Sequence, residues 1–148
     1  IDAPGAAARH EREGPANLWN EYYRLVARAA SSGMYDVMTH LDLPKKFGNR
    51  RPAECAAAEE AAVEAIRAAD VAVEVSSAGL RKPVGEEYPE PELLRKLVGA
   101  GVPIVFSSDG HAPAEVGWGL ERVVAAAKAA GAGSNATFRR RMRTLQPW

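Results

Sequence analysis

Apolar residues recur along this chain in two alternating patterns. One pattern has apolar positions three or four residues apart, the spacing of a single helix face, and it covers residues 15–30, 53–69, 92–100 and 112–131. The other is a short run of mostly apolar residues, typical of a buried parallel strand, and it covers residues 34–39, 71–75 and 103–106. This order predicts an α/β fold in which parallel strands alternate with helices and are joined by right-handed crossovers.

The two ends of the chain lack this alternation. Residues 1–14 are polar and predict an irregular lead-in, in which His10 is expected to be a solvated surface residue. Residues 134–148 carry Arg139, Arg140, Arg141 and Arg143, and both an edge strand and a short helix are compatible with them. We expect this segment to be solvated rather than to bind nucleic acid.

Composition narrows the classes of function. The 148 residues contain 19 basic and 19 acidic side chains, so no broad field favours nucleic acid or membrane as a partner. The single cysteine, Cys55, excludes an internal disulfide framework and is expected to pack in a helix, which suits a cytoplasmic protein. No segment has the pattern of a membrane span or a signal peptide. The chain starts at Ile1 without Met, which suggests a piece of something longer.

Each predicted strand is followed by side chains that can bind ligands. His40 and Asp42, then Lys45, follow the first strand, and Ser107-Ser-Asp109-Gly-His111 ends the third. On extended backbone, residues two apart point the same way, so each His and Asp could grip one ion together. For each of these groups, a loop Asp and a structural or solvated His remain an alternative.

The second strand carries Glu74 among apolar residues, where an unpaired carboxylate would be costly. We expect it either to bind a ligand or to pair with a nearby cation. Arg81 and Lys82 follow small residues and are placed to bind an anion, since guanidinium and ammonium groups both suit phosphate. A solvated loop pair is the alternative. Because the ends of parallel barrel strands meet at one face, all these groups could converge into a metal-dependent hydrolase site.

Three segments together resemble a known family. Thr39-His-Leu-Asp-Leu-Pro-Lys-Lys-Phe-Gly48, Glu74-Val-Ser-Ser-Ala-Gly-Leu-Arg-Lys-Pro83 and Ser107-Ser-Asp-Gly-His-Ala-Pro113 are similar, in order and spacing, to motifs of histidinol-phosphatases of the PHP (polymerase and histidinol phosphatase) type. Gly85-Glu-Glu-Tyr-Pro89 also fits. The resemblance runs from about Trp19 to the C-terminus.

The resemblance implies the C-terminal part of a distorted (β/α)7 barrel and hydrolysis of L-histidinol phosphate in histidine biosynthesis. It also implies divalent metal ions, up to three, of Zn, Mn or Fe. Carried over to this chain, it makes His40, Asp109 and His111 metal ligands and assigns catalysis to Asp109, His111 and Arg81. Arg81 and, less directly, Lys45 and Lys82 become phosphate contacts. The roles of Asp42 and Glu74 stay open.

One departure from the family is large. The His-x-His pair expected on a first barrel strand is absent from residues 1–39, so we expect residues 1–148 to be a partial phosphoesterase domain, prone to self-association. Two alternatives remain: a PHP-type phosphoesterase acting on another phosphorylated small molecule, and an inactive fragment that needs the missing half of the barrel.

Overall fold

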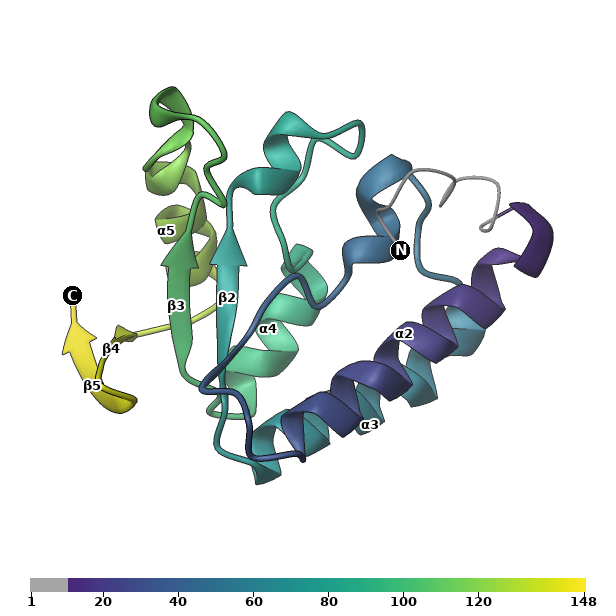
Figure 1. The fold of residues 1–148 in the computed structure, drawn as a ribbon, viewed down its shortest axis with the longest axis horizontal. Helices are drawn as coiled ribbons and strands as arrows, with labels where there is room; N and C mark the ends of the chain where they lie inside the picture. The colour runs from purple at the N-terminus through teal and green to yellow at the C-terminus, as the bar shows by residue number, and fades with distance from the viewer. Residues whose placement is uncertain (1–10) are drawn as a thin grey trace.

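A computed structural model describes residues 11–148, so His10 lies outside the described residues. Three parallel strands, β1 (Val37–Met38), β2 (Ala72–Ser76) and β3 (Ile104–Ser107), form a sheet in the order β1-β2-β3. Val73 of β2 pairs with Met38 of β1 and with Ile104 of β3. The α/β alternation predicted from the sequence is therefore confirmed, with a parallel sheet at its centre (Figure 1).

The helices that accompany the sheet include α2 (Pro15–Ala30), α3 (Ala56–Ala68), α4 (Pro91–Gly99) and α5 (Leu120–Ala129). Helices α2 and α3 run side by side, and α4 and α5 pack closer to β2 and β3 (Figure 1). Short 3-10 helices follow or precede the main elements: Leu43–Phe47, Ala53–Cys55, Ala78–Arg81 and Pro113–Glu115. None of the described helices is long and apolar enough to cross a membrane.

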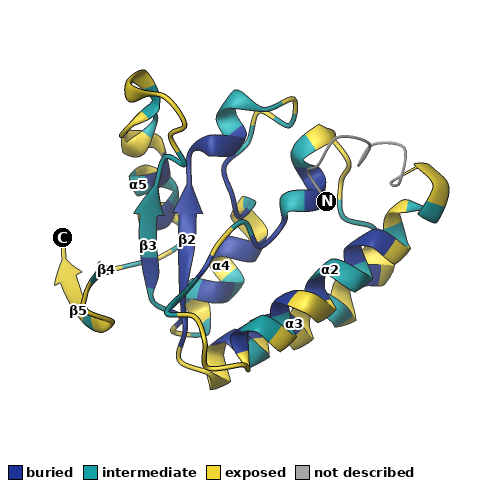
Figure 2. Ribbon diagram, viewed as in Figure 1, coloured by how far each residue is buried: buried dark blue, intermediate teal, exposed yellow. Residues whose placement is uncertain are grey.

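The core forms where the apolar helix faces meet the sheet. Strand β2 is buried along its whole length, whereas the helices show buried and exposed stripes (Figure 2). Trp19 and Tyr23 of α2, Ile66 of α3 and Leu97 of α4 are almost completely buried, which explains the helical spacing of apolar residues in the sequence. Cys55 is also fully buried, as the sequence predicts.

The last predicted helix begins later than the sequence pattern indicates. Pro113–Glu115 forms one 3-10 turn, and α5 starts only at Leu120. Gly117 and Gly119 between them have φ values of 75° and 68°, a left-handed conformation that interrupts a helix. Residues 111–119 therefore form a loop beside the carboxyl ends of β2 and β3.

The C-terminal segment is an antiparallel hairpin of β4 (Ser134–Arg139) and β5 (Met142–Pro147). Two of its arginines bind acidic side chains of the α/β unit: Arg141 contacts the Asp36 carboxylate at 2.9 Å, and Arg143 contacts that of Asp70 at 2.8 Å. This segment is therefore tied to the fold by ion pairs rather than simply solvated. At the other end, residues 11–13 are helical rather than irregular.

Candidate active site

The carboxyl ends of the three parallel strands bring distant parts of the sequence to one pocket. Its volume is about 180 Å³. Residues that follow β1, β2 and β3 all contribute to its walls. The lining residues are His40, Leu43, Lys46, Ala78, Lys82, Tyr88, Asp109, His111 and Glu115. The structure thus brings together four residues that sequence analysis singled out, namely His40, Lys82, Asp109 and His111.

His40 is held from several sides. Its Nδ1 lies 2.6 Å from Glu74 Oε2, and its Nε2 lies 3.3 Å from Asp109 Oδ2. The Tyr22 hydroxyl donates to the His40 carbonyl at 2.5 Å, and the Tyr88 ring stacks on the imidazole with centroids 5.4 Å apart. The hydrogen bond with Glu74 raises the His40 pKa above its ordinary value, against the opposing effect of burial.

Left-handed backbone at two strand ends changes where the side chains point. His40 has φ 51° and Asp109 has φ 47°, values that are uncommon outside glycine and costly unless the surroundings enforce them. The extended backbone assumed for each His-Asp pair is therefore absent at His40 and Asp109. Asp42 is fully buried and pairs with Lys45. The His111 side chain is 80% exposed, and its Nδ1 still lies 3.9 Å from Asp109 Oδ1.

The donor types in this pocket suit a divalent metal ion, since imidazole and carboxylate groups bind Zn, Mn and Fe. Their arrangement in this chain is incomplete, however. Among residues 11–148, no group of three or more His, Cys, Asp or Glu side chains is placed to hold an ion. Both ring nitrogens of His40 face carboxylates instead. Metal binding by His40, Asp109 and His111 remains a prediction.

Arg81 supports the loop that carries Asp109. Its Nη2 donates to the carbonyls of Ser108 at 2.8 Å and Asp109 at 3.2 Å, and its guanidinium lies over the Trp118 ring. Arg81 is not among the residues that line the pocket. Its Nη1 is buried without a hydrogen-bond partner. The observed contacts of Arg81 stabilise the backbone of the loop at Ser108 and Asp109, and its phosphate contact remains a prediction.

The structure does not bring Lys45 to the pocket lining, and its phosphate contact remains a prediction. Its side chain is 2% exposed and its Nζ lies 2.8 Å from Asp42 Oδ2 and 2.6 Å from the Glu87 carbonyl oxygen. Asp42 also accepts a hydrogen bond from the Glu90 N–H, at the start of α4. Burial raises the Asp42 pKa to about 6 despite Lys45. Both residues therefore connect the loop after β1 to α4.

Besides the apolar Leu43 and Ala78, sequence reasoning did not single out three pocket residues that carry a polar group. Lys46 lines it where Lys45 was expected, and the two residues are indistinguishable in sequence without knowledge of the 3-10 turn that contains them. Tyr88 stacks on His40, and only its place in the Gly85-Glu-Glu-Tyr-Pro89 segment gave a signal. Glu115 accepts a hydrogen bond from the His111 N–H, which lowers the Glu115 pKa. Nothing in the local pattern marks that contact.

Comparison with known proteins agrees with the resemblance noted in the sequence. The chain is 40% identical over 147 residues to the "Probable histidinol-phosphatase" of Deinococcus radiodurans, and the match covers 99% of this chain and 55% of that protein. The chain thus spans about half the length of this relative. No protein-family model matches the chain.

The fold is also similar to a crystal structure of the "putative histidinol phosphatase hisK" of Listeria monocytogenes. The TM-score is 0.65 and the identity 21%, over 72% of this chain and 43% of that one. At this identity the likeness concerns the fold alone. The chain is thus similar in sequence to a protein named as a probable histidinol-phosphatase, over about half of that protein's length.

Proposed function

We propose that this chain forms part of a phosphatase that hydrolyses L-histidinol phosphate to L-histidinol and phosphate, in the cytoplasmic biosynthesis of histidine. The observation that carries the proposal is the convergence of His40, Lys82, Asp109 and His111 on one pocket in a chain similar in sequence to a probable histidinol-phosphatase. If the same four residues were scattered over the surface instead, the sequence similarity alone would not support the proposal.

The residues of the pocket suit a phosphate ester. Lys82 and Lys46 put two ammonium groups on its wall, where positive charge stabilises the oxygens of a phosphoryl group in the transition state. When water attacks phosphorus, the bond to the ester oxygen breaks and the leaving alkoxide needs a proton. A protonated group beside the ester oxygen would supply that proton. Asp109 contacts both imidazoles of the pocket, since its carboxylate lies 3.3 Å from His40 Nε2 and 3.9 Å from His111 Nδ1.

The proposal includes divalent ions, Zn, Mn or Fe and up to three of them, which would supply a water molecule of lowered pKa when bound. His40, Asp109 and His111 would contribute part of their ligands. The described residues do not complete such a set. We therefore place the other ligands in the part of the longer relatives that has no counterpart in this chain.

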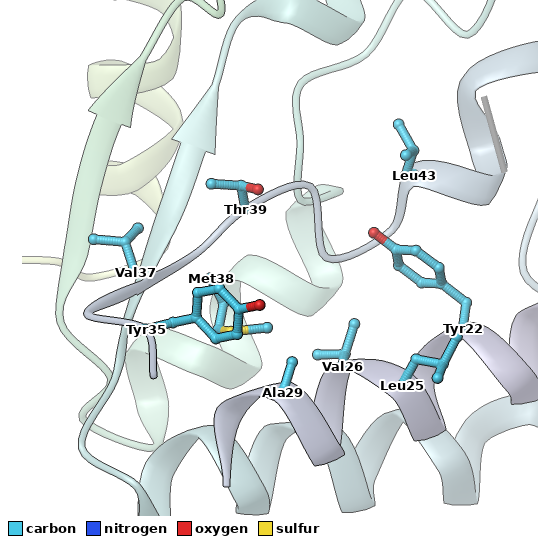
Figure 3. Close-up of a pocket in the computed structure, with 9 residues that line it drawn as sticks. All are labelled: Tyr22, Leu25, Val26, Ala29, Tyr35, Val37, Met38, Thr39 and Leu43. Atoms are coloured by element: carbon cyan, nitrogen blue, oxygen red, sulfur yellow. The ribbon is translucent and has the colours of Figure 1, made fainter. Parts of the chain in front are cut away.

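The part of the longer relatives that has no counterpart in this chain would also account for an apolar groove beside β1. Figure 3 shows residues of α2 and of the segment around β1 facing one groove of about 410 Å³. Leu25 and Tyr35 in its wall are about half exposed, and β1 has a partner strand on one side only among the described residues. We propose that further strands and helices of a distorted (β/α)7 PHP barrel cover this groove, so that residues 1–148 form part of a single phosphoesterase domain.

A chimera tests the proposed function. The segment of the Deinococcus radiodurans relative that matches this chain is replaced by residues 1–148, and phosphate release from L-histidinol phosphate is measured with added Mn²⁺ or Zn²⁺. We expect the chimera to be active and its Asp109→Asn variant to lose at least 100-fold in kcat/KM. Folding is checked by thermal melting.

Other substrates serve as the comparison. If the folded chimera released phosphate from p-nitrophenyl phosphate or nucleotides but not from L-histidinol phosphate, the substrate assignment would be wrong. If Asp109→Asn retained full activity, the pocket described here would not be the active site. Residues 1–148 alone, assayed in parallel, show whether this segment is active without a partner.

A further inference from the structure

His40 lies between two carboxylates that could each bind its ring proton. Glu74 Oε2 is 2.6 Å from Nδ1, and Asp109 Oδ2 is 3.3 Å from Nε2. The shorter distance belongs to a normal, strong hydrogen bond to a charged acceptor, and the longer one to a weak contact. The Glu74 side chain is 7% exposed, against 33% for Asp109, so water competes less with the contact to Glu74.

The ring is also prevented from turning over. Glu74 Oε2 accepts a second hydrogen bond from the His40 backbone N–H at 3.3 Å, so one oxygen holds both the ring and the backbone. Tyr22 fixes the His40 carbonyl, and Tyr88 covers one face of the imidazole with an angle of 19° between the rings. Three separate segments of the chain thus hold a residue whose own backbone is in the left-handed region.

We propose that Glu74 is a positioning residue for the active site: it holds the proton of neutral His40 on Nδ1 and so turns an unprotonated Nε2 towards Asp109 and the pocket. An unprotonated Nε2 and the Asp109 carboxylate repel each other, because both present lone pairs. A positively charged group between or beside these two side chains would relieve that repulsion. In a histidine that binds a metal ion, the nitrogen remote from the ion usually donates to a carboxylate in this way. The functional part of this inference rests on the proposed function, whereas the tautomer does not.

The tautomer is measured directly on residues 1–148. Long-range ¹H–¹⁵N NMR of the imidazoles at alkaline pH distinguishes a proton on Nδ1 from one on Nε2. The rings of His10 and His111 are assigned by replacing each with Gln. We expect neutral His40 to carry its proton on Nδ1. A proton found on Nε2 would overturn the proposal.

Two variants separate positioning from mere packing. Glu74→Leu places an apolar side chain of similar size in β2 and removes the acceptor, so the ring proton of neutral His40 should shift from Nδ1 towards Nε2. Glu74→Gln keeps an acceptor oxygen and should preserve the Nδ1–H form. Glu115→Gln removes a carboxylate from the pocket that His40 lines, at a residue with no contact to His40, and should leave the tautomer unchanged. If Glu74→Leu and wild type gave the same tautomer, Glu74 would have no positioning role.

The functional consequence is measured in the active chimera. We expect Glu74→Leu to lower kcat by about 10- to 100-fold, the usual effect of losing such a supporting contact, while Glu74→Gln restores most of it. An unchanged kcat in Glu74→Leu would contradict the functional part. If the parent chimera proved inactive, the proposed function would fail, and the tautomer of His40 would still decide the structural part.

Discussion

The contact between Gly79 and the loop at Glu86 gives the sharpest prediction from this structure. A Cβ added at Gly79 would lie 2.0 Å from the Glu86 carbonyl oxygen, and it would also approach the Tyr88 ring at 3.1 Å. Ordinary contacts of a Cβ begin at 3.4 Å, so the backbone of the two segments would have to separate by about 1.4 Å. The neighbouring atom belongs to the backbone and cannot turn away as a flexible side chain would.

Several contacts depend on the position of this loop. Ser76 and Tyr88 exchange two backbone hydrogen bonds, of 2.6 and 3.0 Å, and Lys45 binds the Glu87 carbonyl. Overpacking of a rigid site typically costs about 1–3 kcal/mol, and each hydrogen bond lost adds about 1 kcal/mol. We therefore expect Gly79→Ala to lower the free energy of unfolding by roughly 3 kcal/mol.

Urea denaturation measures this change, with a constant m-value showing that stability alone is affected. Gly99→Ala is the matched control, because a Cβ at Gly99, the last residue of α4, meets nothing within 4 Å. That control should be neutral or up to about 1 kcal/mol more stable, since alanine favours a helix. If Gly79→Ala unfolded at the same urea concentration as wild type, the close packing of the two segments would be refuted.

Three further predictions concern buried charges. Lys45→Met should destabilise the fold by about 3–5 kcal/mol in urea denaturation, because it leaves Asp42 buried without its cation. Adding Asp42→Asn to the same chain should restore much of the lost stability. A Lys45→Met variant as stable as wild type would contradict the buried pair. The folded pKa of Asp42, about 6, lies above its ordinary value of 3.8, so its contribution to stability is fully present below pH 4 and is lost as the pH rises towards 6. The stability difference between wild type and Asp42→Asn should change across that window and be flat from pH 7 to 8, and a difference independent of pH would argue against the raised pKa. Arg81→Ala should lower the melting temperature and broaden the NMR signal of the Asp109 amide, because the carbonyls of Ser108 and Asp109 lose their donor; an unchanged amide signal would show that Arg81 does not hold this loop.

Much of the site could be predicted because parallel strands deliver their final residues to one edge. The apolar runs before His40 and Asp109 fixed the strands, and the crossovers then brought both residues to one pocket. The carboxylate of Glu74, unexpected inside an apolar strand, was expected to bind a ligand or a nearby cation, and in the structure its partner is the imidazole of His40. The local sequence pattern therefore predicted the position of residues that directly follow a strand.

Side-chain direction could not be predicted, because it depends on backbone conformation after the strands. The left-handed φ of His40 separates it from Asp42, and the 3-10 turn at Leu43–Phe47 turns Lys45 inward and leaves Lys46 at the pocket. His and Asp adopt the left-handed region more often than most residues, but this preference is too weak to mark a particular His or Asp in advance. The late start of α5 depends on Gly117 and Gly119 in the same way, since only their backbone conformation decides whether a glycine interrupts a helix.

We propose that the pocket at His40, Asp109 and His111 serves the hydrolysis of L-histidinol phosphate. The most direct measurement is the release of phosphate from L-histidinol phosphate by the folded chimera, compared with its Asp109→Asn variant at equal concentration. We expect turnover by the parent chimera and a loss of at least 100-fold in the variant. Equal rates in the two proteins, or release from other phosphate esters alone, would contradict it.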